Sequence, residues 1–289
     1  MPGPNIYASA GAFRRALEDR LKRSAQVEKA DVNRLRRQVA FDRLLARLFL
    51  LDQPRWVLKG GYALELLFDT ARATIDIDLT LPGIDATGRQ ANDVVREMLQ
   101  EASGVSLDDW FEFTIAAPIM DLDAAPYGGA RFPVEAKMDA RIFARFHLDV
   151  GIGDIVLQPV DLVACRDWLA FAGIAQPFVR IIPREQQFAE KLHAYTLPRN
   201  GPNSRVKDLI DLALLVQSGE LVADRVNSAL GATFERRATH AAPRRLDPPP
   251  DAWIKQFADL SENCLAGLNM DDAFRKVRAF WEGLEQSEP

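Results

Sequence analysis

The sequence predicts an α+β protein, in which a mixed β-sheet with flanking helices is followed by a mainly helical C-terminal lobe. Three observations support this fold class. Short apolar or alternating runs between residues 74 and 182 have the length and pattern of strands. Longer stretches on either side repeat apolar residues near the 3.6-residue period of a helix. The chain of 289 residues with 48% hydrophobic content is also long enough to bury a sizeable core.

The N-terminal part begins with two predicted helices, 9–23 and 27–52. Apolar residues recur at helical spacing on one face of the second: Val39, Phe41, Leu44, Leu45, Leu48 and Phe49. A turn at Gly60 and Gly61 leads into a short buried helix over 62–68. The next segments are one helix over 90–102 and five strands, which we place at 74–81, 110–116, 132–138, 146–150 and 178–182.

From residue 183 onward the pattern becomes helical. Pro183 suits the first position of a helix, and Ser204 is a suitable N-cap for another. The expected helices are 183–197, 205–216, 252–267 and 271–284, with a Pro/Arg-rich linker over 240–250. We therefore expect two domains, a sheet-based core over 1–182 and a helical lobe over 183–289 that completes the site.

Composition narrows the classes of protein. Cys165 and Cys264 have no metal-ligand spacing and fit core positions in a reducing cytoplasm. The first residues lack the blocks of a signal peptide, and no apolar run reaches the ~18 residues of a membrane span. These features predict a cytoplasmic protein with no membrane partner.

Charge is distributed unevenly along the chain. The net charge of −5 does not by itself indicate a nucleic-acid partner, but residues 11–50 hold eleven Lys/Arg and five acids, a net charge of +6. Such a surface permits a polyanion to dock, with Arg34, Arg36 and Arg37 as candidate phosphate contacts. The alternative, which charge alone favours, is a surface helix laced with ion pairs.

Two carboxylates within an apolar strand are the most informative feature. Asp76 and Asp78 are two residues apart, so they point to one face of the predicted strand, and Thr74 lies on that face too. Adjacent acids repel unless a cation separates them, and hard oxygen ligands of this kind suit Mg²⁺. On its own, however, Asp-x-Asp is usually a solvated polar face.

The glycine turn and a third acid extend this pattern. The segment Lys59-Gly60-Gly61 precedes the acidic strand and offers a backbone turn that can approach phosphate closely. Asp149 lies in a second apolar strand, where an unpaired carboxylate is costly, and is the best candidate for a third metal ligand. Asp154 follows two glycines and fits a turn. A Gly-Gly turn, a helix and Asp-x-Asp on a strand together form the layout of a nucleotidyltransferase site.

The helical lobe contributes further candidates. Lys191 lies at the edge of a buried helix face, from which a lysine can reach a triphosphate as a point charge. Asp208 and Asp211 follow on the next helix. Their plain alternative is a set of surface ion pairs, Arg205 with Asp208 and Lys207 with Asp211. A packed surface lysine is likewise the plain alternative for Lys191.

Four collinear motifs across about residues 55–216 make the chain resemble the AbiEii/MenT family of nucleotidyltransferase toxins from bacterial toxin–antitoxin systems. They are Lys59-Gly60-Gly61 with Arg72-Ala-Thr74-Ile-Asp76-Ile-Asp78-Leu79, Phe146-His-Leu-Asp149-Val-Gly-Ile-Gly-Asp154, Glu190-Lys191-Leu192-His193-Ala194, and Arg205-Val-Lys207-Asp208-Leu-Ile-Asp211-Leu. Each motif alone is weak, but their joint occurrence is specific.

The resemblance implies roles for individual residues. Asp76 and Asp78 match the metal-binding pair, and Lys191 matches the nucleotide-contacting lysine. Asp208 or Asp211 matches the late active-site aspartate, with Asp208 favoured and Asp211 assigned to nucleotide binding. Gly60 and Gly61, beside Lys59, stand where wider nucleotidyltransferases have Gly-Ser, so backbone amides must hold more of the phosphate.

The resemblance also implies an activity and partners. A nucleoside monophosphate is transferred from an NTP, with Mg²⁺ or Mn²⁺, to the 3′ end of tRNA, which blocks translation. The partner is an antitoxin encoded alongside, and Thr74 occupies the place at which some antitoxins phosphorylate the toxin. Two alternatives stay open: a nucleotidyltransferase acting on a protein or small-molecule hydroxyl, and a non-catalytic nucleotide-binding regulator.

Overall fold

The structure, a computed structural model, describes residues 6–50, 55–82, 88–122, 125–198, 205–262, 264–265 and 267–285. The chain divides into two compact units. The first comprises Met1–Tyr62, Ala73–Gly153 and Asp161–Ile181; the second comprises Ala63–Arg72, Asp154–Val160 and Ile182–Pro289. The two short early segments of the second unit are not predicted by the sequence.

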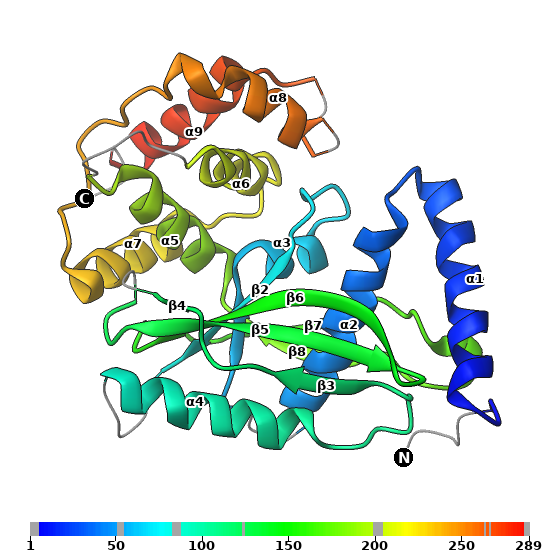
Figure 1. The fold of residues 1–289 in the computed structure, drawn as a ribbon. Helices are drawn as coiled ribbons and strands as arrows, with labels where there is room; N and C mark the ends of the chain where they lie inside the picture. Colours follow the sequence, from blue (N-terminus) through cyan, green and yellow to red (C-terminus); the bar gives the residue numbers. More distant parts are fainter. Residues whose placement is uncertain are drawn as a thin grey trace. The chain divides into compact units, whose positions relative to one another are not determined.

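The first unit is built on a mixed sheet (Figure 1). Its strands are β1 (Val57–Lys59), β2 (Asp76–Leu81), β3 (Glu112–Ile115), β4 (Met120–Asp121), β5 (Gly129–Met138), β6 (Arg141–Ile152), β7 (Asp161–Ala164) and β8 (Phe178–Ile181). The strand order is β3-β5-β6-β2-β1-β8-β7, and β4 pairs with β5. β2 runs parallel to β6 and β1 parallel to β8, whereas the other pairs are antiparallel. The expected mixed sheet is confirmed, although β1, β4 and β7 were not predicted.

Helices α1 (Ala10–Glu28), α2 (Val32–Leu48) and α4 (Gly88–Ser103) also belong to the first unit, together with the short 3₁₀ turn Ala170–Ala172. The boundary between α1 and α2 has a local cause. Lys29 ends α1 in the left-handed conformation, and the side chain of Asp31 caps α2 by accepting from the backbone N–H of Asn33. Helix α1 is therefore longer, and α2 shorter, than the apolar pattern predicts.

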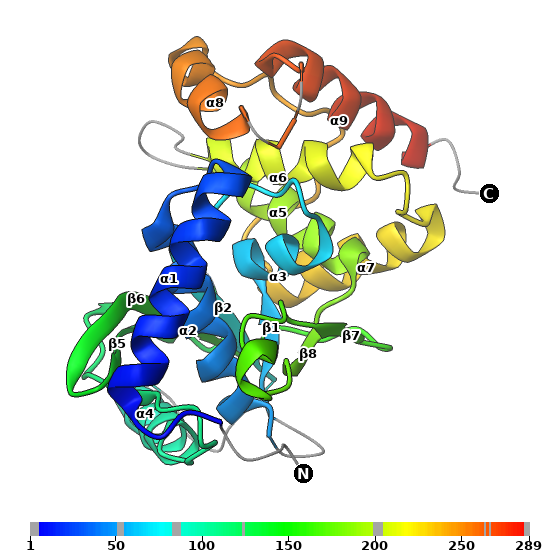
Figure 2. The ribbon, with the colours of Figure 1, turned by 90° about the vertical axis from the view of Figure 1, so that its right-hand side faces the viewer.

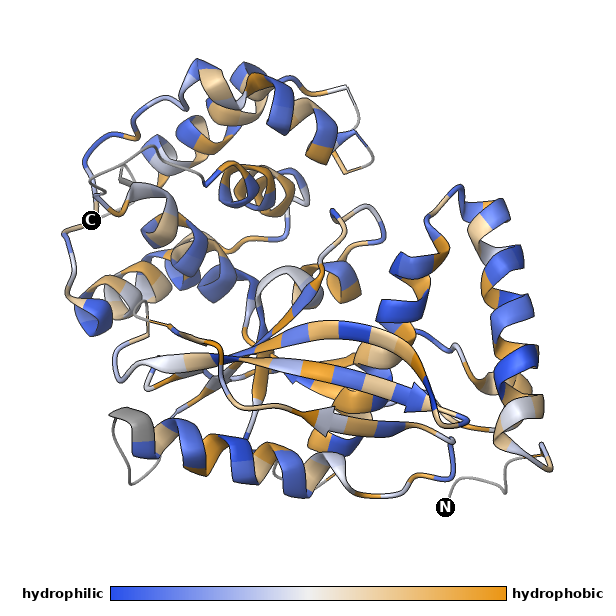
Figure 3. Cartoon of the chain, viewed as in Figure 1, coloured by the Kyte–Doolittle hydropathy of each residue, from blue (hydrophilic) through white to orange (hydrophobic). Residues whose placement is uncertain are grey.

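The sheet has one apolar and one polar face. Figure 3 shows hydrophilic and hydrophobic residues alternating along β5 and β6. Ile77, Leu79 and Leu148 are fully buried, and Phe41 of α2 packs edge-on against Phe146 of β6 with ring centroids 4.8 Å apart. The core of this unit thus lies between α2 and the apolar face.

The second unit is helical. Its helices are α5 (Arg184–Thr196), α6 (Val206–Gln217), α7 (Ala223–Arg237), α8 (Ile254–Ser261) after the 3₁₀ turn Asp251–Trp253, and α9 (Met270–Glu285). Figure 2 shows α6 beside α8 and α9, which it contacts. Helix α6 contributes more fully buried residues to this core than any other helix, including Leu209, Ile210, Leu212 and Ala213. Helix α3 (Gly60–Leu67) begins in the first unit and ends in the second.

Several boundaries in the second unit differ from the expected ones. Pro183 is the N-cap of α5 rather than its first helical residue. The helix expected over 252–267 already ends at Ser261, and α7 was not predicted at all. Ser204, the expected cap of α6, lies outside the described residues. In the described part of the chain, no helix has the length and apolar character needed to span a membrane.

Candidate active site

Three neighbouring strands of the first unit bring Asp76, Asp78 and Asp149 to one face of the sheet. β2 and β6 pair in parallel, with Asp78 beside Asp149 and Asp76 beside His147. β5 pairs with the other edge of β6, with Arg131 beside Asp149. Side chains of paired residues in adjacent strands point to the same face, so Arg131, Asp149 and Asp78 form one row across the sheet. The prediction that Asp149 lies on a strand next to the Asp76 strand is confirmed.

The apolar face determines where these acids point. Ile77 and Leu79 alternate with the two aspartates along β2 and are fully buried. A slip of one residue in the pairing of β2 would bury both carboxylates and expose the two apolar side chains. The hydrophobic core therefore fixes the register that places Asp76 and Asp78 on the polar face.

Arg131 links the acids of different strands. Its Nε donates to Asp149 Oδ1 at 2.7 Å, and its Nη2 donates to Asp149 Oδ2 at 2.7 Å and to Asp76 Oδ2 at 3.3 Å. His147 Nδ1 lies 3.3 Å from the other oxygen of Asp76. The hydrogen bonds that Arg131 donates to Asp149, and then the charges of Asp149, Asp76 and Asp78, raise the pKa of Arg131 above its ordinary value. The guanidinium is thus a permanent cation among Asp76, Asp78 and Asp149, which we call the acid row.

The two glycines, which were expected to form a turn before the helix, are instead the first residues of α3, and Gly60 lies directly beside the acid pair. Lys59 of β1 pairs with Asp78 of β2, and Gly60 follows with a φ of 68°. A Cβ placed on Gly60 would lie 2.2 Å from Asp78 Oδ2, well inside contact distance. Gly60 is therefore required both by its backbone conformation and by the close approach of the Asp78 carboxylate.

A buried hydrogen bond anchors the helix that these glycines begin. The hydroxyl of Tyr62 donates to Asp42 Oδ1 at 2.5 Å. Burial raises the pKa of Asp42 to about 7, an effect that the hydrogen bond from Tyr62 opposes. Because Asp42 belongs to α2, this bond ties the start of α3 to the helix that supports the sheet.

Thr74 lies elsewhere than predicted. The acidic strand begins at Asp76, so Thr74 precedes it and does not share a strand face with Asp76 and Asp78. The Thr74 hydroxyl instead donates to the backbone oxygen of Asp76 at 3.4 Å. This residue remains next to Asp76, but through the local chain rather than through the alternation of a strand.

The second unit holds a separate charged cluster on α5 and α6. Lys191 Nζ lies 2.8 Å from Asp211 Oδ2 and 3.3 Å from Asp208 Oδ1. Arg72 donates two hydrogen bonds to Asp211, at 2.8 and 2.7 Å. Of the surface pairs considered from the sequence, Arg205 with Asp208 is present at 3.5 Å. Asp211 pairs across the fold rather than along its own helix.

Burial makes this cluster strongly coupled. Asp211 has an exposed side-chain fraction of 1%, compared with 8% for Asp208 and 16% for Lys191. Burial favours a higher pKa for Asp211, but the charges of Lys191 and Arg72 outweigh it and lower that pKa. Burial likewise opposes the charge of Lys191, yet Asp211 and Asp208 raise its pKa above the ordinary value. Lys191 is thus held charged between two acids and is not a simple surface lysine.

Two other expectations are corrected. Asp154 does not simply serve a turn, because it is buried and accepts two hydrogen bonds from Arg237, each of 3.0 Å.

Among the basic candidates on α2, Arg34, Arg36 and Arg37 are all half-buried. Arg36 is engaged with Glu18 of α1 through contacts of 2.6 to 3.0 Å. For Arg36 the ion-pair alternative therefore describes the structure.

The acid row fits a hard divalent cation with few protein ligands. In the described ranges, no group of three or more His, Cys, Asp or Glu residues is arranged to hold a metal ion. Asp76 and Asp78 nevertheless present two carboxylates on one face, beside a glycine position that a Cβ would fill. Mg²⁺ is commonly bound by one or two carboxylates together with substrate phosphates. The donor set is thus compatible with this ion.

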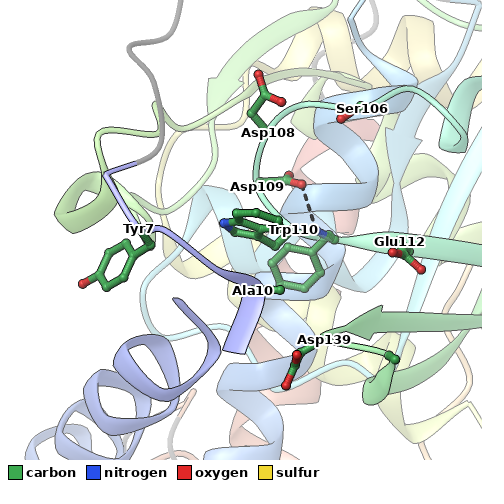
Figure 4. Close-up of a pocket in the computed structure, with 10 residues that line it drawn as sticks. Tyr7, Ala10, Ser106, Asp108, Asp109, Trp110, Glu112 and Asp139 are labelled. Atoms are coloured by element: carbon green, nitrogen blue, oxygen red, sulfur yellow. Dashed lines mark hydrogen bonds between the residues drawn. The ribbon is translucent and has the colours of Figure 1, made fainter. Parts of the chain in front are cut away.

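A pocket of about 510 Å³ lies at the other end of the same sheet. It is lined by Tyr7, Trp110 and Phe111 and by the turn between β5 and β6 at Asp139 (Figure 4). Figure 4 also shows the buried Asp109 accepting from the backbone N–H of Phe111, a bond of 3.1 Å. None of the site residues predicted from the sequence lines this pocket.

A mixed sheet with paired acids beside a pair of glycines defines a class of protein, the nucleotidyltransferases. A family model described as "Nucleotidyl transferase AbiEii toxin, Type IV TA system" matches residues 43–284. The chain belongs to this AbiEii family, and it is a nucleotidyltransferase toxin of a toxin–antitoxin system. The family implies a cognate antitoxin as partner. No curated protein matches the chain.

Several solved structures are similar to this chain, and the first of the three that follow supports the fold. MenT4, the nucleotidyltransferase toxin Rv2826c from Mycobacterium tuberculosis H37Rv, aligns with 94% of this chain and 99% of its own, with 18% identity and a TM-score of 0.57. A putative nucleotidyltransferase from H. pylori aligns over 88% and 97%, with 17% identity and a TM-score of 0.47. JHP933 from Helicobacter pylori aligns over 88% and 94%, with 16% identity and a TM-score of 0.47.

Two charged residues of these clusters were missed by the sequence reasoning. Arg72 was quoted within a motif but given no role, because its partner Asp211 lies 139 positions further on. Arg131 was not singled out, since the pairing of β5 with β6 that places it beside Asp149 has no local signal. The available clue was the position of Arg131 directly before the strand predicted at 132–138, which the structure extends back to Gly129.

Proposed function

We propose that this toxin transfers a nucleoside monophosphate from an NTP to the 3′ end of tRNA, with release of pyrophosphate and a block of translation. The observation that supports this proposal best is the acid pair of β2. Asp76 and Asp78 share the polar face, and Gly60 is held against Asp78. This arrangement supports a cation site next to the start of α3, at which backbone could approach phosphate.

The chain's own residues supply positions and charges. Asp76 and Asp78 would hold the divalent ion, Mg²⁺ or Mn²⁺, which when bound neutralises phosphate charge and activates the attacking hydroxyl. Lys59, Gly60 and Gly61 form the segment proposed to receive the nucleotide. Phosphoryl-type transfer depends chiefly on positioning and charge stabilisation, so residues of this kind suffice for it.

The cluster on α5 and α6 supplies the remaining proposed roles. Lys191 is proposed as a nucleotide contact, because its ammonium is held charged within hydrogen-bonding distance of two acids. Asp208 is proposed as the late catalytic acid. Its contacts, 3.3 Å to Lys191 and 3.5 Å to Arg205, are longer than those of Asp211. Asp211 would support the nucleotide site through the side chains that it holds.

The acceptor is the part of the proposal with the least direct support. The net positive charge of residues 11–50 favours a polyanion such as RNA over a protein or small-molecule hydroxyl. A non-catalytic nucleotide-binding regulator is disfavoured, because both acids of β2 are present and share one face.

The test separates the reaction from its acceptor. The full chain would be incubated with Mg²⁺ and tRNA and with each NTP labelled either at the α- or at the γ-phosphate. Nucleotidyl transfer moves only the α label into RNA. Transcript tRNA with an intact 3′ end should be labelled, whereas periodate-oxidised tRNA should not. Label that appears in protein, or in no acceptor, would redirect the proposal to its alternatives.

Control by the cognate antitoxin is proposed to act at Thr74. A phosphate there adds about −1.5 to −2 charges at pH 7 beside Asp76, whose backbone oxygen accepts from the Thr74 hydroxyl. The added charge would capture the cation or repel the triphosphate, and Thr74→Glu should lose transferase activity while Thr74→Val keeps it. Mass spectrometry after co-expression with the antitoxin should detect the phosphate. An active Thr74→Glu variant, or an unmodified Thr74 in a neutralised toxin, would reject this role.

A further inference from the structure

Asp149 is the acid whose two oxygens have the shorter contacts, whereas the two oxygens of Asp76 have contacts of 3.3 Å each. Arg131 donates to both oxygens of Asp149 at 2.7 Å, from its Nε and its Nη2. Such a bidentate arginine–carboxylate pair is among the stronger charge-assisted hydrogen-bonded pairs in proteins. The exposed fraction of the Asp149 side chain is 12%, lower than the 20% of Asp76. To ligate an ion, Asp149 would have to give up a hydrogen-bonded partner while largely buried.

We propose that Arg131 is a positioning residue of the transfer site, that Asp149 is its anchor, and that Asp76 and Asp78 alone provide carboxylate ligands to the metal ion. This inference rests on the metal site proposed above. It differs from the prediction made from the sequence, in which Asp149 is a third ligand.

The contacts of Arg131 explain what it positions. The same Nη2 that donates to Asp149 also donates to Asp76 Oδ2 at 3.3 Å. Two carboxylates so close together repel each other when both are ionised, and a guanidinium between them removes that cost. His147 contacts the other oxygen of Asp76. Arg131 and His147 therefore fix both oxygens of Asp76 from neighbouring strands.

The charges of this face partly cancel in pairs. Arg131 offsets Asp149, and Lys59, which is paired in register with Asp78, offsets part of the charge of the two acids of β2. The pair formed by Arg131 and Asp149 is neutral in total, so removing both charges together should leave the balance at the ion unchanged.

A matched pair on the same face provides the control. Arg145 of β6 donates to Glu135 of β5 at 2.7 Å, and the two residues are paired in register, like Arg131 and Asp149. Their side chains are more exposed, 66% for Arg145 and 33% for Glu135. Glu135 and Arg145 lie four positions along their strands from Arg131 and Asp149, so neutralising this pair should not affect an ion at the acids of β2.

The experiment measures Mn²⁺ binding to the full chain by electron paramagnetic resonance, which counts free Mn²⁺ and needs no turnover. Asp149→Asn frees Arg131 to bind Asp76 and compete with the ion, so the affinity for Mn²⁺ should fall about tenfold. Adding Arg131→Gln to Asp149→Asn should restore the affinity to within about threefold of the native chain. A second double variant combines Arg131→Met with Asp149→Asn. Circular dichroism verifies that each variant is folded.

The outcomes separate this inference from the metal site itself. Rescue in the double variants, with no change in Glu135→Gln/Arg145→Gln, supports the positioning role. Double variants that bind Mn²⁺ as weakly as Asp149→Asn would show that Asp149 is a ligand, and the inference would be overturned. If the native chain binds no Mn²⁺, or binds it equally after Asp76→Asn, the proposed metal site fails and the inference fails with it.

Discussion

Asp208 and Asp211 lie three residues apart on α6, and exchanging each for asparagine should affect stability and activity to different degrees. Asp211 accepts two hydrogen bonds from Arg72 and lies 2.8 Å from Lys191, with 1% of its side chain exposed. Asp208 has only longer contacts, of 3.3 and 3.5 Å. Asp211→Asn should therefore impair the fold of the second unit, whereas Asp208→Asn should chiefly impair the reaction.

The magnitude follows from burial. Breaking a buried ion pair by removing one partner costs about 3–5 kcal/mol, because the other charge is left uncompensated. Asp211→Asn leaves two such cations, Arg72 and Lys191, with Asp208 as the remaining acid. We expect a loss of about 3 kcal/mol or more for Asp211→Asn and about 1 kcal/mol for Asp208→Asn, whose contacts are longer. For a unit of this size the first value lowers the melting temperature by roughly 10 °C.

Urea and thermal unfolding of the full chain, followed by circular dichroism, would measure these differences, and the labelled-NTP assay would measure transfer. The pH dependence gives a second readout. Because the pKa of Asp211 is lowered in the fold, its contribution is present above its ordinary value of 3.8 and is lost as the pH falls below it. Asp211→Asn should remove that acid sensitivity. The reasoning is refuted if Asp208→Asn is the more destabilising exchange, or if the two differ by less than about 1 kcal/mol.

Three further predictions follow from the same contacts. Asp76→Asn or Asp78→Asn should abolish transfer and toxicity with no loss of thermal stability in metal-free buffer, because each exchange removes like-charge repulsion; full activity in either variant would contradict the metal pair. Gly60→Ala should abolish transfer, because its Cβ would lie 2.2 Å from Asp78 Oδ2. The control Gly173→Ala is also at positive φ but has nothing within 4 Å, so it should only lower stability modestly. Equal losses of activity in the two variants would reject the contact. Burial, and then a nearby arginine, lowers the pKa of His193 from 6.5 to about 4. The contribution of His193 to the free energy of unfolding should therefore be complete above pH 6.5 and fall by up to about 3 kcal/mol towards pH 4. His193→Gln should flatten this pH dependence, and a flat profile for the native chain would disprove it.

The features that the sequence predicted best are those with a local period. Alternation along β2 placed Ile77 and Leu79 in the core and Asp76 and Asp78 opposite them, as the structure confirms. The same kind of signal was available for α7 and was missed. Its buried residues recur at helical spacing: Val226, Ala229, Leu230, Thr233 and Phe234.

The features that could not be predicted from the sequence depend on pairing between segments that are far apart in the chain. Arg72 and Asp211 are separated by 139 positions, so a spacing argument favoured the nearer Lys207 as the partner of Asp211. Whether the Asp149 carboxylate has a hydrogen-bond partner depends on Arg131, which lies 18 positions earlier on a different strand. The start of β2 at Asp76 rather than Thr74 is likewise a matter of pairing, since His147 is the first residue of β6 that pairs with β2.

The charge balance of the two clusters indicates which partner each can attract. In the second unit Arg72, Lys191 and Arg205 stand against Asp208 and Asp211, which leaves a net charge of +1. In the first unit Asp76, Asp78 and Asp149 stand against Arg131 and Lys59, which leaves a net charge of −1. A cluster with excess positive charge favours phosphate, and one with excess negative charge favours a divalent cation. The same side-chain types, in two different balances, therefore give each unit a preference for a different kind of ligand.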